Sequence, residues 1–140
     1  MSRRRRSEPA DVLYREAAIA AVAPVVQPSC TDSTSEPLVE LELRGTLDEP
    51  IREVRAVVFR LSRTRERRFS FIDRVRPYVD VVAHLPPESF DYVWSLALSG
   101  HLRYASIHFA KPHRGRASVQ GLSFYKEQEG TEPSQADPAP

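Results

Sequence analysis

The chain is poor in the residues from which most chemical sites are built. Its 140 residues include one cysteine, Cys30, which excludes an intramolecular disulfide and any metal site made of several cysteines of one chain. Five glycines are dispersed, and neither glycine-rich phosphate-binding pattern occurs. No serine lies in the spacing of a known hydrolase nucleophile. We therefore expect a protein that is not an enzyme, with no cofactor and no metal.

Long apolar runs are also absent. No stretch reaches the roughly 18 residues that a membrane-spanning helix needs. Arg3 to Arg6, followed by the apolar stretch 17–26, have some features of a signal peptide, but charged residues lie between them and prolines interrupt the end. The lone cysteine fits a reducing compartment. We expect a cytoplasmic protein without membrane contact.

Charge is nearly balanced overall, at +1, but it is unevenly placed. Residues 52–76 contain nine arginines against three acidic residues, whereas residues 127–140 carry acids and no base. Arginine supplies 18 of the 20 basic residues along the whole chain. Because arginine is preferred along the whole chain, we interpret its excess as a property of the overall composition. Recognition of phosphate or carboxylate groups is the alternative interpretation.

Composition divides the chain into three parts. Residues 1–36 read as a flexible arm with a basic start, a short helix over the alanine-rich stretch 9–23, and a polar linker. Residues 37–126 read as one β-rich globular domain. Residues 127–140 read as a disordered, acidic and proline-rich tail.

Within the globular part, alternating apolar and polar residues predict strands. They cover residues 39–43, 52–61, 69–72 and 79–85, and residues 45–50 read as a turn. Residues 56–59 are apolar at consecutive positions, which is typical of a central strand covered on both faces.

A helix and a hairpin follow. Phe90, Val93, Trp94 and Ala97 fall on one face of a 3.6-residue repeat, which predicts a helix over about 87–99. Residues 102–125 contain two alternating runs joined by a connection with a proline and a glycine, which predicts a β-hairpin. Ala105, Ile107 and Phe109 are expected to face the core, and Tyr104, Ser106 and His108 to form an open polar face.

These elements predict a mainly β protein, with α+β as the alternative. The expected architecture is an antiparallel sandwich or a curved sheet of five to six strands with one helix. No strand-helix-strand alternation appears, so a doubly wound parallel sheet is not expected. No motif is specific enough to indicate a family.

Two candidate binding surfaces remain. We expect a non-catalytic protein-binding or assembly module, and tyrosines suit such interfaces, so Tyr104, His108 and Tyr125 are the candidate residues for a protein partner or self-association. The alternative is nucleic-acid or other polyanion binding, because arginines neutralise phosphates and Phe69 and Phe71 interleave with them. Its candidate residues are Arg63, Arg65, Arg67, Arg68, Arg74 and Arg76.

A metal site is the least favoured reading of the histidines. His84 and His108 could pair across neighbouring strands, with Asp80 on the same face as His84. No pair has recognised ligand spacing, so scattered histidines on a solvated face are the better interpretation.

Overall fold

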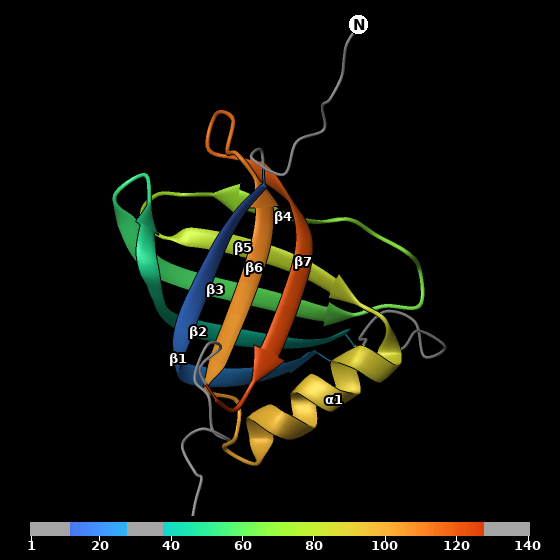
Figure 1. Ribbon diagram of the computed structural model, residues 1–140. Helices are drawn as coiled ribbons and strands as arrows, with labels where there is room; N and C mark the ends of the chain where they lie inside the picture. The colour runs from blue at the N-terminus through green and yellow to red at the C-terminus, as the bar shows by residue number, and fades with distance from the viewer. Residues whose placement is uncertain (1–11, 28–37, 128–140) are drawn as a thin grey trace, which may run out of the picture.

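The computed structural model describes residues 12–27 and 38–127, which form a closed seven-stranded barrel with one helix (Figure 1). The strand order around the barrel is β1-β2-β3-β5-β4-β7-β6. The elements are β1 (Val12–Gln27), β2 (Leu38–Ile51), β3 (Val54–Arg63), β4 (Ser70–Arg74), β5 (Val79–Leu85), α1 (Pro87–Leu98), β6 (Tyr104–Ala110) and β7 (Ala117–Tyr125).

The mainly β prediction with one helix is confirmed, but the architecture differs from the expected one. The sheet is neither a sandwich nor an open curved sheet, because β1 pairs with both β2 and β6 and so joins its two ends. It is not wholly antiparallel either. After the short strand β4, the chain returns between β3 and β4, which makes β5 parallel to β3 and antiparallel to β4.

Residues 12–27 form strand β1 of the barrel. The helix expected at 9–23 and the start of the globular part expected at residue 37 are therefore wrong. Alanines favour a helix in an isolated segment, but here the segment bonds along both of its edges, to β6 over Val12–Ala18 and to β2 over Ala17–Gln27. Tertiary pairing therefore decides the conformation. Residues 1–11 and 28–36 of the expected arm lie outside the described residues, as do residues 128–140 of the expected tail.

The turn expected at residues 45–50 lies further along the chain. Residues 45–51 continue β2, and the chain reverses at Arg52 and Glu53, whose φ values are 47° and 73°. Two consecutive positive φ values are the conformation of the tight hairpin turns that match the twist of a sheet.

The barrel interior is filled by apolar side chains from every strand. Leu41, Phe59, Val81 and Ile107 are all fully buried. Val57, Val58 and Phe59 are buried in succession, so β3 is covered on both faces at Val58, whereas Ala56 on the same outer face is exposed. A dense apolar filling of this kind leaves the outer faces and the two ends of the barrel as the places for binding sites.

Helix α1 confirms its prediction and lies across one end of the barrel (Figure 1). Pro87 occupies the first helical position, where its missing N–H costs no hydrogen bond. Phe90, Val93 and Ala97 are buried. Gly100, with a φ of 82°, turns the chain out of the helix toward β6.

The predicted hairpin is also confirmed, as β6 and β7.

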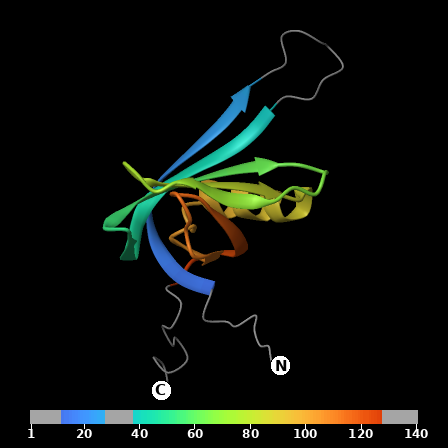
Figure 2. The same ribbon diagram turned by 90° about the horizontal axis from the view of Figure 1, so that it is seen from above.

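Figure 2 shows the barrel from above, with the second half of β1 and the first half of β2 running away from it as a two-stranded ribbon. Among the described residues, no helix has the length and apolar character needed to cross a membrane.

Candidate protein-binding face

Strands β1, β6 and β7 bring four ring-bearing side chains together on the outside of the barrel. On β6, Tyr104 lies opposite Tyr125 of β7, and His108 lies opposite Tyr14 of β1. Successive side chains of a strand point to opposite faces, and Ala105, between these positions, faces the barrel interior. The four rings therefore share the outer face. We call Tyr14, Tyr104, His108 and Tyr125 the aromatic face.

The rings pack in two pairs. Tyr104 and Tyr125 are stacked with centroids 6.1 Å apart, and Tyr14 lies 4.7 Å from the His108 ring. Tyr14 and His108 are exposed, whereas Tyr104 and Tyr125 are half-buried. The aromatic face is thus a fixed surface of ordered rings, with its most accessible part on Tyr14 and His108.

A buried carboxylate lies beneath these rings. The Glu16 residue is only 6% exposed, and its Oε2 accepts a hydrogen bond from the Tyr125 hydroxyl. Its backbone N–H donates to Oδ1 of Asp48 at 3.1 Å. Burial and the hydrogen bond to Glu16 raise the pKa of Tyr125 above its ordinary value. Tyr125 therefore remains a hydrogen-bond donor that holds Glu16 in place.

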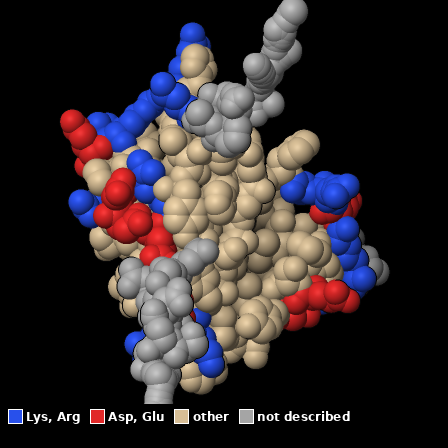
Figure 3. All heavy atoms as spheres, in the orientation of Figure 1, with Lys and Arg blue, Asp and Glu red and all other residues tan. Residues whose placement is uncertain are grey.

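Most outward positions around the aromatic face carry uncharged residues, with exposed Arg103 beside Tyr104 at one end. The other outward positions that flank it include Ala18, Ser106, Gly121 and Ser123. Figure 3 shows the same face without Lys, Arg, Asp or Glu through its middle, with charged side chains gathered at the left and right margins. Depletion of charge at the centre is a property of protein-protein interfaces.

Ser106 departs from the open polar face expected for this strand. It is 2% exposed, whereas Tyr104 is half-buried and His108 exposed. The neighbouring β1 strand explains the difference, since Glu16 lies directly opposite Ser106 and the larger rings cover both. Only the His108 end of this face is fully open.

The arginine cluster expected over residues 63–76 is divided between the two ends of β5. Arg63 lies opposite Leu85 at the end of β5, whereas Arg74 lies opposite Asp80 near its start. Seven strand residues separate these ends by roughly 20 Å. Figure 1 shows the connection after β3 at one side of the barrel and the end of β4 at the other.

We call residues 64–69 the arginine loop, and residues 64–68 of this loop border a hollow of about 420 Å³. Arg65, Arg67, Arg68 and His84 line it. Arg68 pairs with Glu66 at 3.2 Å, while Arg65 and Arg67 form no hydrogen bond or ion pair with any described residue. Burial, and after it the charge of Arg68, lowers the pKa of His84, while the charge of Glu40 acts in the opposite direction.

The remaining arginines of that set have structural partners. Arg63 bonds Asp91 of α1 at 3.0 Å. Arg76 donates to the Arg52 carbonyl at 3.0 Å. Arg74 lies 3.9 Å from buried Asp80, which also receives two hydrogen bonds from Arg60. These contacts hold the barrel together and leave Arg65 and Arg67 as the side chains available for a ligand.

The suggested pairing of His84 with His108 is wrong. His84 lies on β5 between β3 and β4, whereas His108 lies on β6 between β1 and β7. Asp80 is engaged by Arg60. In the described ranges, 12–27 and 38–127, no group of three or more His, Cys, Asp or Glu side chains is placed to hold a metal ion.

Sequence reasoning missed Tyr14 and Glu16, the two residues that β1 adds to the aromatic face. The missed signal is the alternation of Leu13, Arg15 and Ala17 with Tyr14 and Glu16, which is a strand pattern within a segment of helix-forming composition. Without a partner strand in view, the composition dominates the interpretation.

Comparison with protein-family models, with curated proteins and with solved structures finds no match to this chain.

Proposed function

We propose that this chain is a small, non-catalytic protein-binding module that docks its partner, or a second copy of itself, on the aromatic face. The observation that carries the proposal is the gathering of Tyr14, Tyr104, His108 and Tyr125 from three strands onto one surface that exposes no charged side chain through its middle. β1 lies about 90 positions before the β6–β7 hairpin, so only the closure of the barrel adds Tyr14 to this surface.

Physical chemistry supports a protein partner for such a surface. Tyrosine rings bury a large area on binding yet lose little conformational freedom, and their hydroxyls can still bond to polar groups. Here the Tyr104–Tyr125 stack is already ordered, and Glu16 fixes Tyr125 from below. Pre-organisation of this kind reduces the entropic cost of association.

Site-specific crosslinking tests the proposal. A photoreactive benzoyl-phenylalanine at position 14 is expected to crosslink one defined partner, or a second copy, in extracts of cells that express the full chain. The same residue in place of Tyr92, an exposed tyrosine of α1, is the matched control. Purified partner should then bind the Tyr14→Ala, His108→Ala double variant at least 10-fold more weakly than the wild type. A monomer in light scattering with no crosslink specific to position 14 would overturn the proposal.

The arginine loop supports a second candidate, the binding of single-stranded nucleic acid or another polyanion. Arg65 and Arg67 are exposed beside a hollow lined by three arginines and Glu66, and Phe69, at the end of the loop, is 91% exposed. Cations next to an exposed ring are the elements that bind a phosphate backbone and stack a base.

Salt-dependent binding of a 20-residue oligo-dT tests this candidate. Arg65→Gln with Arg67→Gln is expected to weaken binding and to lower the salt dependence by about 1 to 2 phosphate contacts. Arg114→Gln at the far end of the barrel is the control. Equal binding by the wild type and by the Arg65→Gln, Arg67→Gln variant would rule the candidate out, as would the absence of binding by the wild type at low salt.

A further inference from the structure

Strand β1 is longer than the strand that pairs with its second edge. It pairs with β6 only over Val12–Ala18, and the last backbone bond on that side joins the Ile19 N–H to the Arg103 carbonyl at 2.8 Å. From Ala20 to Val26 this edge of β1 has no backbone partner among the described residues, while the other edge remains paired with β2. We call residues 20–26 on this side the free edge. An unpaired edge presents a row of N–H and C=O groups that can accept another strand.

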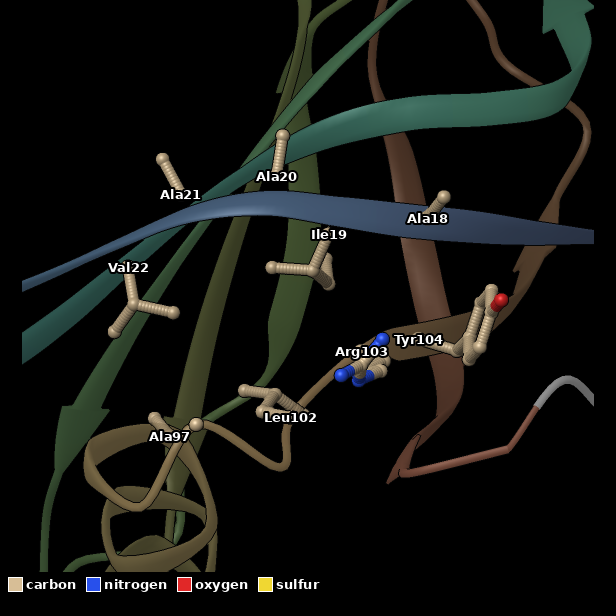
Figure 4. Close-up of a pocket in the computed structure, with 10 residues that line it drawn as sticks. Ala18, Ile19, Ala20, Ala21, Val22, Ala97, Leu102, Arg103 and Tyr104 are labelled. Carbon is tan, nitrogen blue, oxygen red and sulfur yellow. The ribbon is translucent and has the colours of Figure 1, made fainter.

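A hollow of about 350 Å³ lies beside the free edge, between β1 and the end of α1. Figure 4 shows Ile19 and Val22 on the side of β1 that faces Ala97 and Leu102, while Ala20 and Ala21 point the other way. Ala97 and Leu102 are buried, so they form an apolar floor. A strand laid along the edge would direct alternate side chains into this hollow.

One charged side chain borders the hollow, that of Arg103. It is exposed, and its guanidinium forms no hydrogen bond or ion pair with any described residue. The segment from Ala17 to Gln27 carries no charge of its own. A carboxylate on an incoming strand would therefore meet a cation and no competing acid in the lining of the hollow.

We propose that the free edge of β1 receives one extended peptide strand from a partner protein, with an apolar side chain in the hollow and an acidic side chain on Arg103. Main-chain bonds would supply affinity and the two side-chain positions specificity. Pro24 lacks an N–H, so the ladder is expected to be strongest over Ala20–Ala23. A second copy that paired through its own β1 would bring its α1 and residues 100–103 beside the free edge as well. A single extended peptide occupies only the width of one strand there.

Tyr104 lines the hollow and also belongs to the aromatic face, but Tyr14 and His108 do not line the hollow, so variants of Arg103 and of Tyr14 with His108 test the two sites separately. A random dodecapeptide library displayed on phage is selected against the full chain. The peptides expected to be enriched alternate apolar and polar residues and contain Asp or Glu. Arg103→Glu should weaken them at least 10-fold, and replacement of their acidic residue by Lys should restore binding to that variant. Lys111→Glu, the same charge reversal at the far end of the barrel, should bind as the wild type does.

Hydrogen exchange locates the bound peptide. Saturating peptide is expected to slow exchange of the Ala20–Ala23 amides, which binding elsewhere would not do directly. The proposal is overturned if no peptide is enriched, if binding is indifferent to Arg103→Glu, or if the selected peptides depend on Tyr14 and His108 instead. Protection of the same amides by dimerisation, without peptide, would make a second copy the occupant and would also overturn it.

Discussion

Tyr125, the last residue of β7, donates a hydrogen bond from its hydroxyl to the carboxylate of Glu16 on β1, 109 positions earlier in the chain. The bond crosses over β6 and joins the first and last described strands on the outer face of the barrel. Because Glu16 is buried, water cannot freely replace the Tyr125 hydroxyl as its hydrogen-bond donor, so loss of this bond costs free energy of folding. The contact is therefore a structural link and also the base of the aromatic face.

Tyr125→Phe removes that donor and is expected to lower the free energy of unfolding by about 1–3 kcal/mol, because a buried carboxylate loses a hydrogen bond. Urea denaturation followed by circular dichroism measures the loss. Tyr92→Phe, on the exposed face of α1, is the control and should change stability by less than about 0.5 kcal/mol. Equal effects of the two substitutions would show that the Tyr125 hydroxyl carries no net stabilisation.

Gly45→Ala tests how closely β1 and β2 approach. A Cβ at this position would lie 2.2 Å from the backbone oxygen of Ala18, so the strands must move apart. We expect a loss of about 1–3 kcal/mol, the usual cost of overpacking. In Gly121→Ala the new Cβ would meet His108 atoms at an ordinary 3.5 Å, so this matched strand substitution should be nearly neutral. Thermal melts of the two variants would separate these outcomes, and similar melting temperatures would contradict the argument.

Glu53→Gly tests the strain in the β2–β3 turn. Glu53 has a φ of 73°, a conformation that costs an L residue about 1–2 kcal/mol. Glycine adopts it freely, so we expect a gain of up to about 1 kcal/mol, since glycine also raises the entropy of the unfolded chain. Gly115→Ala is the converse experiment, because Gly115 has a φ of 78° and a Cβ there would meet only Cγ2 of Val75, at an ordinary 4.0 Å. Chemical denaturation should show opposite signs for the two substitutions.

His84 predicts a pH dependence of stability. Its pKa is lowered from the ordinary value of 6.5, first by burial and then by the charge of Arg68. Below pH 6.5 the unfolded chain therefore binds a proton that the folded chain resists, and stability falls as the pH falls toward the pKa of the folded state. Urea titrations between pH 7.5 and 5 measure how steeply the free energy of unfolding changes with pH. The change should be smaller in the His84→Gln variant than in the wild type. An unchanged slope in that variant would assign the dependence to other groups.

Local patterns predicted most of the individual elements. The repeat of Phe90, Val93 and Ala97 placed α1 to within one residue, because one helix face packs on one core. The alternation around Ile107 placed the hairpin for the equivalent reason in a strand. Both elements have patterns that depend on a single buried face.

Elements decided by distant partners were not predicted. Residues 12–27 have helix-forming composition, and only the pairings with β2 and β6 make them a strand. The turn at Arg52 and Glu53 lacks the glycine or asparagine that usually indicates positive φ. The return of β5 between β3 and β4 likewise has no local pattern.

The candidate sites follow the same division. Tyr104, His108 and Tyr125 could be assigned to one face because they belong to one hairpin, where register follows from the connection. Arg63 to Arg76 are near in sequence, but β4 carries the chain across the barrel between them, so proximity in sequence did not predict proximity in space.

The pairing of β1 with β6 has a consequence for the order in which the chain folds. Val12 pairs with Ala110 and Ala18 with Tyr104, contacts between residues about 90 positions apart, which makes them costly to form early. During synthesis β1 is made before β6, so its uncharged second half lacks the closed barrel until β6 has been made. We therefore expect closure of the barrel to be a late event in folding, with the uncharged second half of β1 in need of protection until then.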